Sequence, residues 1–238
     1  PDFPETAVPK NLNYNMWLGS TPEVYYTEMR VHPQNDYSRP GWLRCGQFGA
    51  GMITGWGAHF FDYSSWGMDT ENTGPISIEG VAEFPKKGLW NVHGEFMVKA
   101  EYENGITMYT SGGLPTGIKY EGEEGWIYVS HAGDKKFEAS DPQILTSEIK
   151  ENEIHLYQSE EHHGNWLECI KSRKQPISPI EMGHRACTVC LISHIAMKVP
   201  GVLKWDPKTE RFADNKLANS MLKNPQRFPY GTDYIKRI

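Results

Sequence analysis

Apolar residues between Gly49 and Met68 recur at three- and four-residue spacing, the period of one helix face. The pattern predicts an amphipathic helix over this stretch, with Gly67 as a suitable stop. The preceding residues 1–48 are rich in Pro, Asn, Tyr and Trp and show little periodicity. We therefore expect an extended lead-in with a short helical turn near Asn13–Leu18. The recurring positions of the helix are Met52, Ile53, Trp56, His59, Phe60, Tyr63 and Trp66.

Residues 76–139 show the two-residue alternation of half-buried strands. Asn104-Gly105 is a type I′ hairpin signal, and Ile106–Tyr109 reads as the returning strand. Lys119–Glu121 and Trp126–Ser130 flank a second turn. Because these strands follow one another without intervening helices, the sheet is predicted to be antiparallel. The alternating apolar positions of the first strand are Val92, Phe96, Val98, Ala100 and Tyr102.

The last third of the chain, residues 161–238, is predicted to be helical with a polar tail. Glu161–Ser172 carries apolar residues on one face. Ser178-Pro179-Ile180-Glu181 combines a capping box with proline at the first helical position, so a helix should run from here to about Lys198. Val202–Trp205 reads as a short strand. Residues 1–238 then form one α+β domain, a mostly antiparallel open sheet with helices packed on one face.

Composition excludes several classes of protein. The chain is 38% hydrophobic with a net charge of -6, which argues against a non-specific nucleic-acid surface. No run approaches the roughly 18 apolar residues of a membrane span, so no membrane partner is expected. The chain opens Pro1-Asp2 without Met, which leaves a cytoplasmic or an exported location open. Cys187 and Cys190 lie in an apolar helical stretch and are expected to be buried thiols.

The segment Gly49-Ala50-Gly51-Met52-Ile53-Thr54-Gly55 is a relative of the dinucleotide-binding fingerprint, but its context differs. The fingerprint follows an apolar strand and opens a βαβ unit, whereas residues 42–48 are not a strand pattern and an antiparallel sheet follows. The segment is therefore predicted to be a glycine-rich helix start where the backbone comes close to another group. We expect this chain to bind no NAD or NADP by itself.

The stretch from Gly49 to Asp62 resembles a motif of the Gfo/Idh/MocA oxidoreductases, in which a glycine-rich helix start leads to a histidine and then an aspartate. The resemblance implies a two-domain dehydrogenase in which NAD or NADP binds a Rossmann half. This sequence corresponds to the other half, a dihydrodipicolinate-reductase-like C-terminal domain that binds a sugar or polyol and forms homo-oligomers through its sheet; the Rossmann domain is absent. Further collinear matches are Trp17-Leu18-Gly19, Pro22-Glu23-Val24, Trp66-Gly67-Met68, Thr73-Gly74-Pro75, Glu181–Ala186 and Trp205-Asp206-Pro207.

His59 is the candidate base, because it matches the motif histidine and an imidazole titrates near working pH. A structural helix histidine is the alternative. Many family members carry an aspartate four residues before the histidine, where this chain has Gly55. Asp62, one turn beyond His59, is the candidate to assist it, and bracing of the fold is an equal alternative.

Four more residues are weaker candidates for substrate binding. Arg44 and Gln47 precede the glycine-rich turn and could hydrogen-bond hydroxyl or acid groups, with surface salt bridging the alternative for Arg44. His184 and Arg185 begin the capped helix, where an anion could bind, and packing is equally compatible. His162-His163 lacks a third ligand at suitable spacing, so no metal site is predicted.

Two rival functions remain open at this stage. One is an NAD-dependent glycosidase of the same superfamily, for which Gly55 and the many tryptophans leave room. The other is a stand-alone carbohydrate-binding or scaffold module in which the region of His59 is structural.

Overall fold

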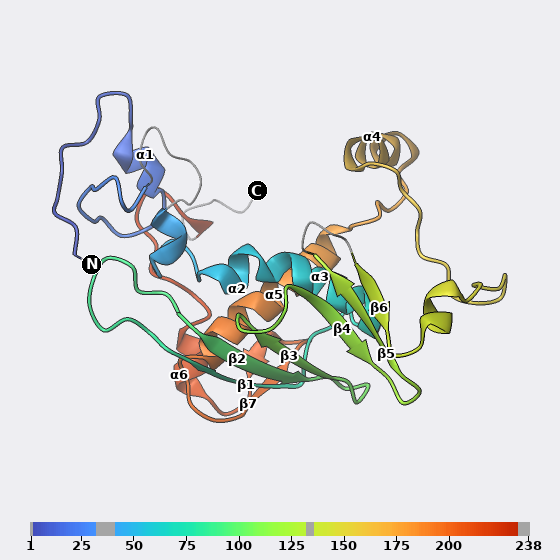
Figure 1. Ribbon diagram of the computed structural model, residues 1–238. Coiled ribbons are helices and arrows are strands. Elements are labelled where there is room, and N and C mark those ends of the chain that lie inside the picture. Colours follow the sequence, from blue (N-terminus) through green and yellow to red (C-terminus); the bar gives the residue numbers. More distant parts are fainter. Residues whose placement is uncertain (1, 32–40, 132–135, 233–238) are drawn as a thin grey trace. The chain divides into compact units, whose positions relative to one another are not determined.

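The computed structural model describes residues 2–31, 41–131 and 136–232 (Figure 1). Contacts divide the chain into two compact units. The first unit comprises Pro1–Ala58, Pro75–Gly113 and Val189–Ile238, and the second comprises His59–Gly74 and Leu114–Thr188. The boundaries fall within two helices, α3 (Gly57–Met68) and α5 (Ile180–Ala196). The prediction of an α+β fold with antiparallel sheets is confirmed.

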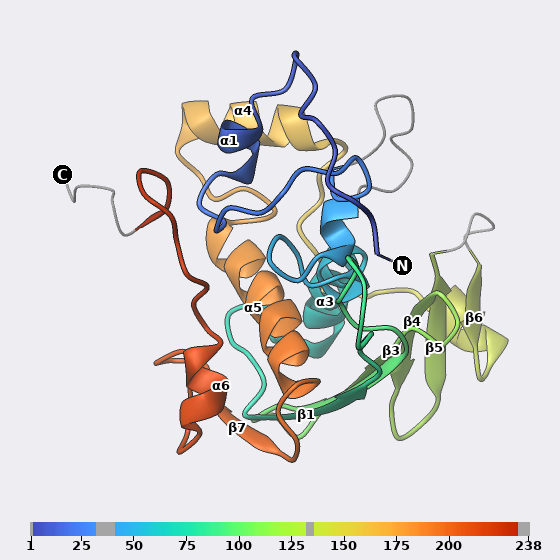
Figure 2. The same cartoon turned by 90° about the vertical axis from the view of Figure 1, so that its left-hand side faces the viewer.

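The first unit is built on a five-stranded antiparallel sheet in the order β3-β2-β1-β7-β8. Residues 189–196 of α5 lie on one face of this sheet, as both ribbon views show (Figures 1 and 2). The prediction that helices cover one face therefore holds in this unit. The strands are β1 (Ser77–Ala82), β2 (Phe96–Glu101), β3 (Thr107–Ser111), β7 (Leu203–Asp206) and β8 (Arg211–Phe212).

Alternation along the strands separates a buried face from an exposed one. Ile78 and Val98 are each 1% exposed, and Ala100 is fully buried. On the other face, the ammonium group of Lys99 lies 2.6 Å from a carboxylate oxygen of Glu101, on its own strand. The core on the buried side is completed by Val189, Cys190, Ile192, Ile195, Ala196, Leu203, Trp205 and Phe212.

The hairpin between β2 and β3 differs from the predicted type I′ turn. Tyr102 and Ile106 close the loop, since the amide of Tyr102 donates to the carbonyl of Ile106 at 2.9 Å. Gly105 has φ +86°, whereas Asn104 keeps a negative φ. A type I′ turn needs positive φ at both central residues, so the observed connection is the three-residue loop with glycine in the left-handed position. The sequence signal therefore placed the turn correctly and assigned the wrong type.

The N-terminal segment and the tail of the first unit contain short elements. The predicted turn near Asn13–Leu18 is α1 (Tyr14–Leu18), capped by the side chain of Asn13. A 3-10 helix, η1, spans Gly41–Arg44. The polar tail beyond Trp205 includes β8 and α6 (Lys216–Ser220).

The second unit holds a separate three-stranded antiparallel sheet in the order β4-β5-β6, so the single sheet predicted over 76–139 is two sheets. Tyr120 joins this sheet to α3, because its hydroxyl donates to the carbonyl of Tyr63 at 2.8 Å. The predicted helix at Glu161–Ser172 is α4 (His162–Ser172), with Glu161 as its N-cap. The remaining elements are β4 (Gly117–Glu121), β5 (Trp126–Ser130), β6 (Phe137–Ala139) and the 3-10 helix η2 (Pro142–Thr146).

The predicted helix from Gly49 to Met68 is two helices, α2 (Met52–Gly55) and α3. Part of its apolar stripe faces outward: Met52, Trp56 and Tyr63 are 46%, 50% and 45% exposed. The buried positions are instead Ile53, Gly57, Phe61, Ser64, Ser65 and Met68, which include small and hydroxyl side chains. Hydrophobic spacing identified the helix but not the face that packs.

Candidate functional site

His59 and Asp62 lie one turn apart on α3, in the second unit. His59 is exposed, whereas Asp62 is half-buried. Burial raises the pKa of the Asp62 carboxyl, and the nearby imidazole of His59 opposes that shift. The helix therefore presents an exposed imidazole with a carboxyl group close enough to interact with it electrostatically. Such a pair can take up a proton on the imidazole and stabilise the resulting charge.

The glycine-rich turn before α2 is held by His93 from the segment after β1. The amide of Ile53 donates to Nε2 of His93 at 3.4 Å, and Nδ1 of His93 lies 3.0 Å from the carbonyl of Gly94. Gly51 has φ +76°, and a β-carbon there would lie 3.0 Å from Val92 Cγ2 and 3.1 Å from His93 Nε2. The prediction that the backbone of the glycine-rich turn comes close to another group is confirmed at Gly51. The element that precedes the turn is η1, not the strand that a dinucleotide fingerprint requires.

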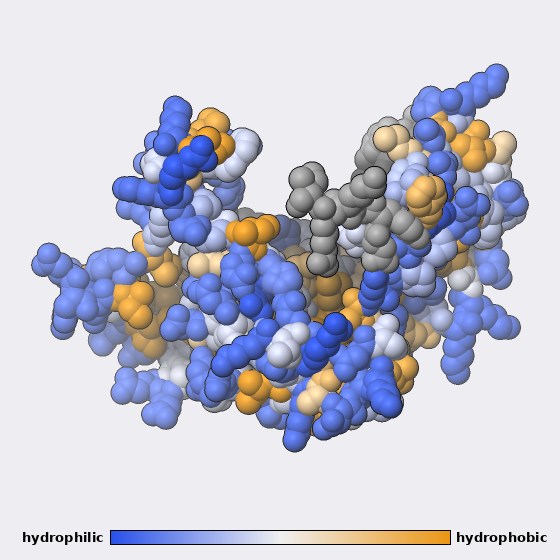
Figure 3. Space-filling model, turned by 180° about the vertical axis from the view of Figure 1, so that it is seen from behind, coloured by the Kyte–Doolittle hydropathy of each residue, from blue (hydrophilic) through white to orange (hydrophobic). Residues whose placement is uncertain are grey.

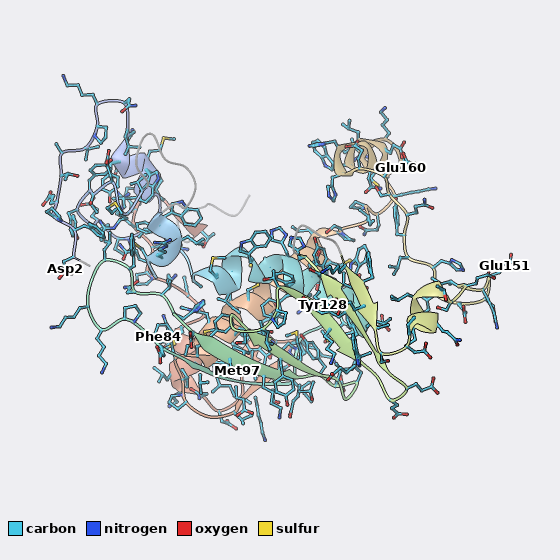
Figure 4. All side chains as sticks on the ribbon, viewed as in Figure 1. Asp2, Phe84, Met97, Tyr128, Glu151 and Glu160 are labelled. Carbon is cyan, nitrogen blue, oxygen red and sulfur yellow. The ribbon has the colours of Figure 1, made fainter. Side chains whose placement is uncertain are left out.

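His194 of α5 is a second imidazole of the first unit that sequence reading missed, and it is half-buried. Its ring centroid lies 6.4 Å from that of His93 and 6.1 Å from that of Phe84, which Figure 4 labels. Burial lowers the pKa of His194 to about 4, and the charges of Lys198 and His93 act in the same direction. Its Nδ1 is buried and has no hydrogen-bond partner among the described residues. Burial likewise lowers the pKa of His93, against hydrogen bonds to Gly94 and Ala50.

These histidines predict a loss of stability in acid. The unfolded chain binds a proton on His194 near the ordinary pKa of about 6.5, before the folded chain does. The stability is therefore complete above about pH 6.5 and falls as the pH approaches 4, where the folded chain is also protonated. Urea unfolding of the unaltered protein should show a fall in the free energy of unfolding between about pH 6.5 and about pH 4. In His194→Leu this fall should be smaller by about 2 kcal/mol, a value reduced to allow for the partial exposure of the imidazole. The control is His163→Gln on α4, which should show the same fall in the free energy of unfolding as the unaltered protein. An equal fall in the unaltered protein and in both variants would contradict the role assigned to His194.

The four weaker candidates lie in different surroundings. Arg44 belongs to the first unit, and its guanidinium carbon lies 4.6 Å from the ring centre of Trp90. In the second unit, Arg185 pairs with Glu181, with 2.6 Å between Nη2 and Oε1. His184 is exposed in the second turn of α5, beyond the first four amides that could bind an anion. Arg44 thus makes a cation–π contact, and Arg185 forms an ion pair within its own helix.

Gln47, the last predicted substrate contact, lines a pocket of about 1070 Å³ that lies wholly in the first unit. Sequence reading missed the rest of this pocket, because its walls come from both ends of the chain. The only advance signal was the richness of the lead-in in aromatic and polar residues. The lining residues are Trp17, Leu18, Gly19, Ser20, Thr21, Pro22, Trp42, Gln47, Phe48, Arg211, Asn219, Leu222, Lys223, Asn224, Pro225, Gln226 and Thr232.

The described residues contain no group of three or more side chains suited to holding a metal ion. Among the same residues, no helix is both long enough and apolar enough to cross a membrane. Cys45 and Cys190 are buried as free thiols, which confirms the prediction for Cys190. Cys187 is exposed, which corrects the prediction for that residue, because it lies on the solvent side of α5.

Residues 2–232 match the model of a Gfo/Idh/MocA family domain, which is described as the oxidoreductase family, C-terminal alpha/beta domain. The chain belongs to this family. The match spans both units of this Gfo/Idh/MocA domain and confirms the resemblance carried by the motif from Gly49 to Asp62. No curated protein is significantly similar to the chain in sequence.

Solved structures show the same fold at low sequence identity. An NAD-binding protein from Listeria innocua aligns with a TM-score of 0.52 and 17% identity, over 70% of this chain and 51% of its own. A protein from Thermotoga maritima assigned as an oxidoreductase aligns with a TM-score of 0.51 and 15% identity, over the same shares, 70% and 51%. The Gfo/Idh/MocA domain thus spans about half the length of these structures.

Gly55 is where this Gfo/Idh/MocA domain departs from the motif described above. A β-carbon at this position would lie 3.6 Å from Leu43 Cδ2, an ordinary contact. The backbone of α2 therefore leaves room for the first side-chain atom, and packing does not require glycine here. Without an aspartate at 55, Asp62 is the acidic group one turn from His59.

Proposed function

We propose that this domain is the substrate-binding part of an NAD(P)-dependent oxidoreductase that acts on a sugar or polyol. The observation that carries the proposal is the exposed His59 of α3 with the half-buried Asp62 one turn on, in a chain of an oxidoreductase family. The glycine-rich turn follows a 3-10 helix instead of a strand, so these residues do not fit a nicotinamide dinucleotide by themselves. We assign the cofactor, NAD or NADP, to a Rossmann half outside this chain.

Oxidation of a secondary alcohol removes a hydride from carbon, which the nicotinamide would accept, and a proton from oxygen. In the proposed reaction His59 takes the hydroxyl proton on its imidazole. Asp62 then stabilises the imidazolium, because an ionised carboxylate beside it favours the charged ring. In the second unit, His184 and Arg185 are proposed substrate contacts, and Arg185 would exchange its pairing with Glu181 for the substrate. In the first unit, Arg44 and Gln47 are proposed substrate contacts.

The test is turnover by the full-length polypeptide that contains this domain. A panel of aldoses, inositols and acyclic polyols is offered with NAD or NADP, and formation of the reduced nicotinamide is followed by absorbance. The proposal expects at least one compound to be oxidised. Release of the aglycone from a glycoside without net reduction of the cofactor would favour the glycosidase instead.

A carbohydrate-binding module without catalysis is a second candidate, which the pocket of the first unit favours. Trp17, Trp42 and Phe48 line it together with side-chain amides, a combination suited to sugar rings and hydroxyls. Sugar binding without turnover in the full-length polypeptide would support this candidate.

We also propose that copies of the domain associate through the five-stranded sheet. Its outward face carries Val81, Met97 and Tyr109, which are 69%, 40% and 60% exposed, beside the ionic residues around Lys99. Met97 is labelled on β2 in Figure 4. Elsewhere, on the face drawn in Figure 3, hydrophobic residues form small groups among hydrophilic ones. Light scattering of the purified protein would give its molar mass and show whether it is an oligomer.

A further inference from the structure

The helix α4 of the second unit turns apolar side chains toward solvent. Trp166, Leu167 and Ile170 are 60%, 50% and 44% exposed. They share one face of the helix, because Ile170 follows Leu167 by three residues and Trp166 by four. None of the residues of α4, all of which the structure describes, is buried. Groups of large apolar side chains on a surface mark a contact with a partner.

The opposite side of α4 is attached to its own chain. The side-chain amide of Asn165 donates to the hydroxyl of Tyr157 at 2.8 Å, and its carbonyl oxygen accepts from the backbone amide of Ile177 at 3.0 Å. Successive residues of a helix are about 100° apart around its axis, so Asn165 lies almost opposite Leu167. The chain before and after the helix is therefore bonded to the Asn165 side, and these bonds keep the apolar face on the outside.

Charged residues at the two ends of α4 have opposite signs. Glu160, which Figure 4 labels, and Glu161 lie at the N-terminal end, whereas Lys171, Arg173 and Lys174 lie at the C-terminal end. All five are exposed. This order suits the dipole of the helix itself, which favours acidic groups at its start and basic groups at its end. It also makes the surface of α4 complementary to a copy of itself that runs in the opposite direction.

A two-fold axis perpendicular to α4 would produce that arrangement. It places a second α4 antiparallel to the first, with the middle of the apolar face, Leu167, near the axis. The acidic end of each helix then lies beside the basic end of the other, and the two apolar faces cover each other. A parallel pair would instead bring like charges together. The partner that fits this surface best is therefore a second copy of the domain.

We propose that two copies of this domain associate through α4, as an antiparallel helix pair that buries Trp166, Leu167 and Ile170. This surface belongs to the second unit, whereas the five-stranded sheet belongs to the first. The proposal does not rest on the oxidoreductase assignment. A pair of helices that are each about 16 Å long buries less than the roughly 1,600 Å² of a standard interface, so the dimer is weak and its population rises with concentration.

The test is sedimentation of the full-length polypeptide over a wide range of concentrations. Leu167→Glu places a carboxylate in the middle of the pair, twice by symmetry, and should weaken the association at least about thirtyfold. Ile170→Glu should act in the same way. An unaltered protein that stays monomeric throughout, or a molar mass that neither variant lowers, would overturn the proposal.

The matched control is Leu217→Glu on α6 of the first unit, where the leucine is 56% exposed. This variant adds the same charge at a similar exposure and should keep the association. Circular dichroism and thermal unfolding confirm that each variant is folded. A loss as large as that of Leu167→Glu would show that added charge alone is responsible, and it would contradict the assignment to α4.

An exchange of charges tests the antiparallel direction. Glu160→Lys and Lys174→Glu should each weaken the association by about fivefold, because each brings like charges together at both ends of the pair. The double variant restores opposite charges and should associate to within about twofold of the unaltered protein. A double variant in which the two losses simply multiply would reject the antiparallel pair.

A variant of the sheet separates this interface from the association proposed above. Tyr109→Glu, on the outward face of the five-stranded sheet, should leave the α4 pair intact, and Leu167→Glu should lower the molar mass further in that background. If the apolar face instead binds the Rossmann half of the same polypeptide, Leu167→Glu would lower the thermal stability at an unchanged molar mass. That result would overturn the proposal.

The outcomes also separate the α4 pair from the proposed function. A molar mass that depends on Leu167 in a polypeptide without turnover would retain the pair and reject the oxidoreductase. Turnover of a sugar by a polypeptide whose molar mass ignores Leu167 would do the reverse.

Discussion

Replacing His59 with asparagine is expected to lower kcat for the oxidised sugar or polyol by about 10²–10⁴-fold, the usual contribution of a general base. Asparagine cannot accept the hydroxyl proton, yet it is polar and similar in size. Because His59 is exposed on α3, the change should leave the free energy of unfolding nearly unaltered. The measurement is the initial rate of nicotinamide reduction by the full-length polypeptide at saturating substrate.

His163→Asn provides the matched control for this experiment. The side chain of His163 is 90% exposed on α4, and its imidazole nitrogen lies 3.5 Å from Glu161, so it has no place in the proposed chemistry. The control should retain wild-type kcat. If His59→Asn retains it as well, the histidine of the motif is structural in this protein and the base must be sought elsewhere.

Gly51→Ala is expected to destabilise the domain by about 2–4 kcal/mol. Gly51 combines φ +76° with ψ -153°, a conformation that side chains other than glycine adopt only under strain. The added methyl group would also press on Val92 Cγ2 at 3.0 Å and on Nε2 of His93 at 3.1 Å. Urea unfolding gives the change in the free energy of unfolding.

Gly183→Ala is the opposite case in the same chain. Gly183 lies inside α5, and a β-carbon there would meet no atom within 4 Å. Alanine should therefore stabilise the protein by about 0.5–1 kcal/mol through its higher helix propensity. Destabilisation by both substitutions to the same extent would show that the strain assigned to Gly51 is absent.

Sequence reasoning succeeded where a structural feature depends on neighbours in the chain. The helical segments Asn13–Leu18 and Glu161–Ser172 were located from the sequence, and the structure shows that Asn13 and Glu161 cap them. The spacing of His59 and Asp62 placed them on the same turn of a helix. The turn at Gly105 was located for the same reason, although its type depended on the register between β2 and β3.

Long-range pairing decided what the sequence left open. Strand β7 joins β1 from more than a hundred residues away and carries the edge strand β8 beside it, and the strands of 76–139 divide into two sheets. The buried face of α2 and α3 likewise depended on which partners met them, so the apolar stripe with Met52, Trp56 and Tyr63 stayed exposed. No local period contains that information.

The sequence by itself determined the family, the helices and hairpins, and the histidine–aspartate pair, because each of these features depends on residues a few positions apart in the chain. Only the tertiary structure decided the pocket, whose walls join residues 17–22 to residues 222–226, and the proximity of the His93 and His194 imidazoles. The walls of the pocket are joined by Arg227, whose hydrogen bonds to Asn15 and Gly19 span more than two hundred residues. Such contacts form when the chain folds, and they leave no pattern in the linear order of its residues.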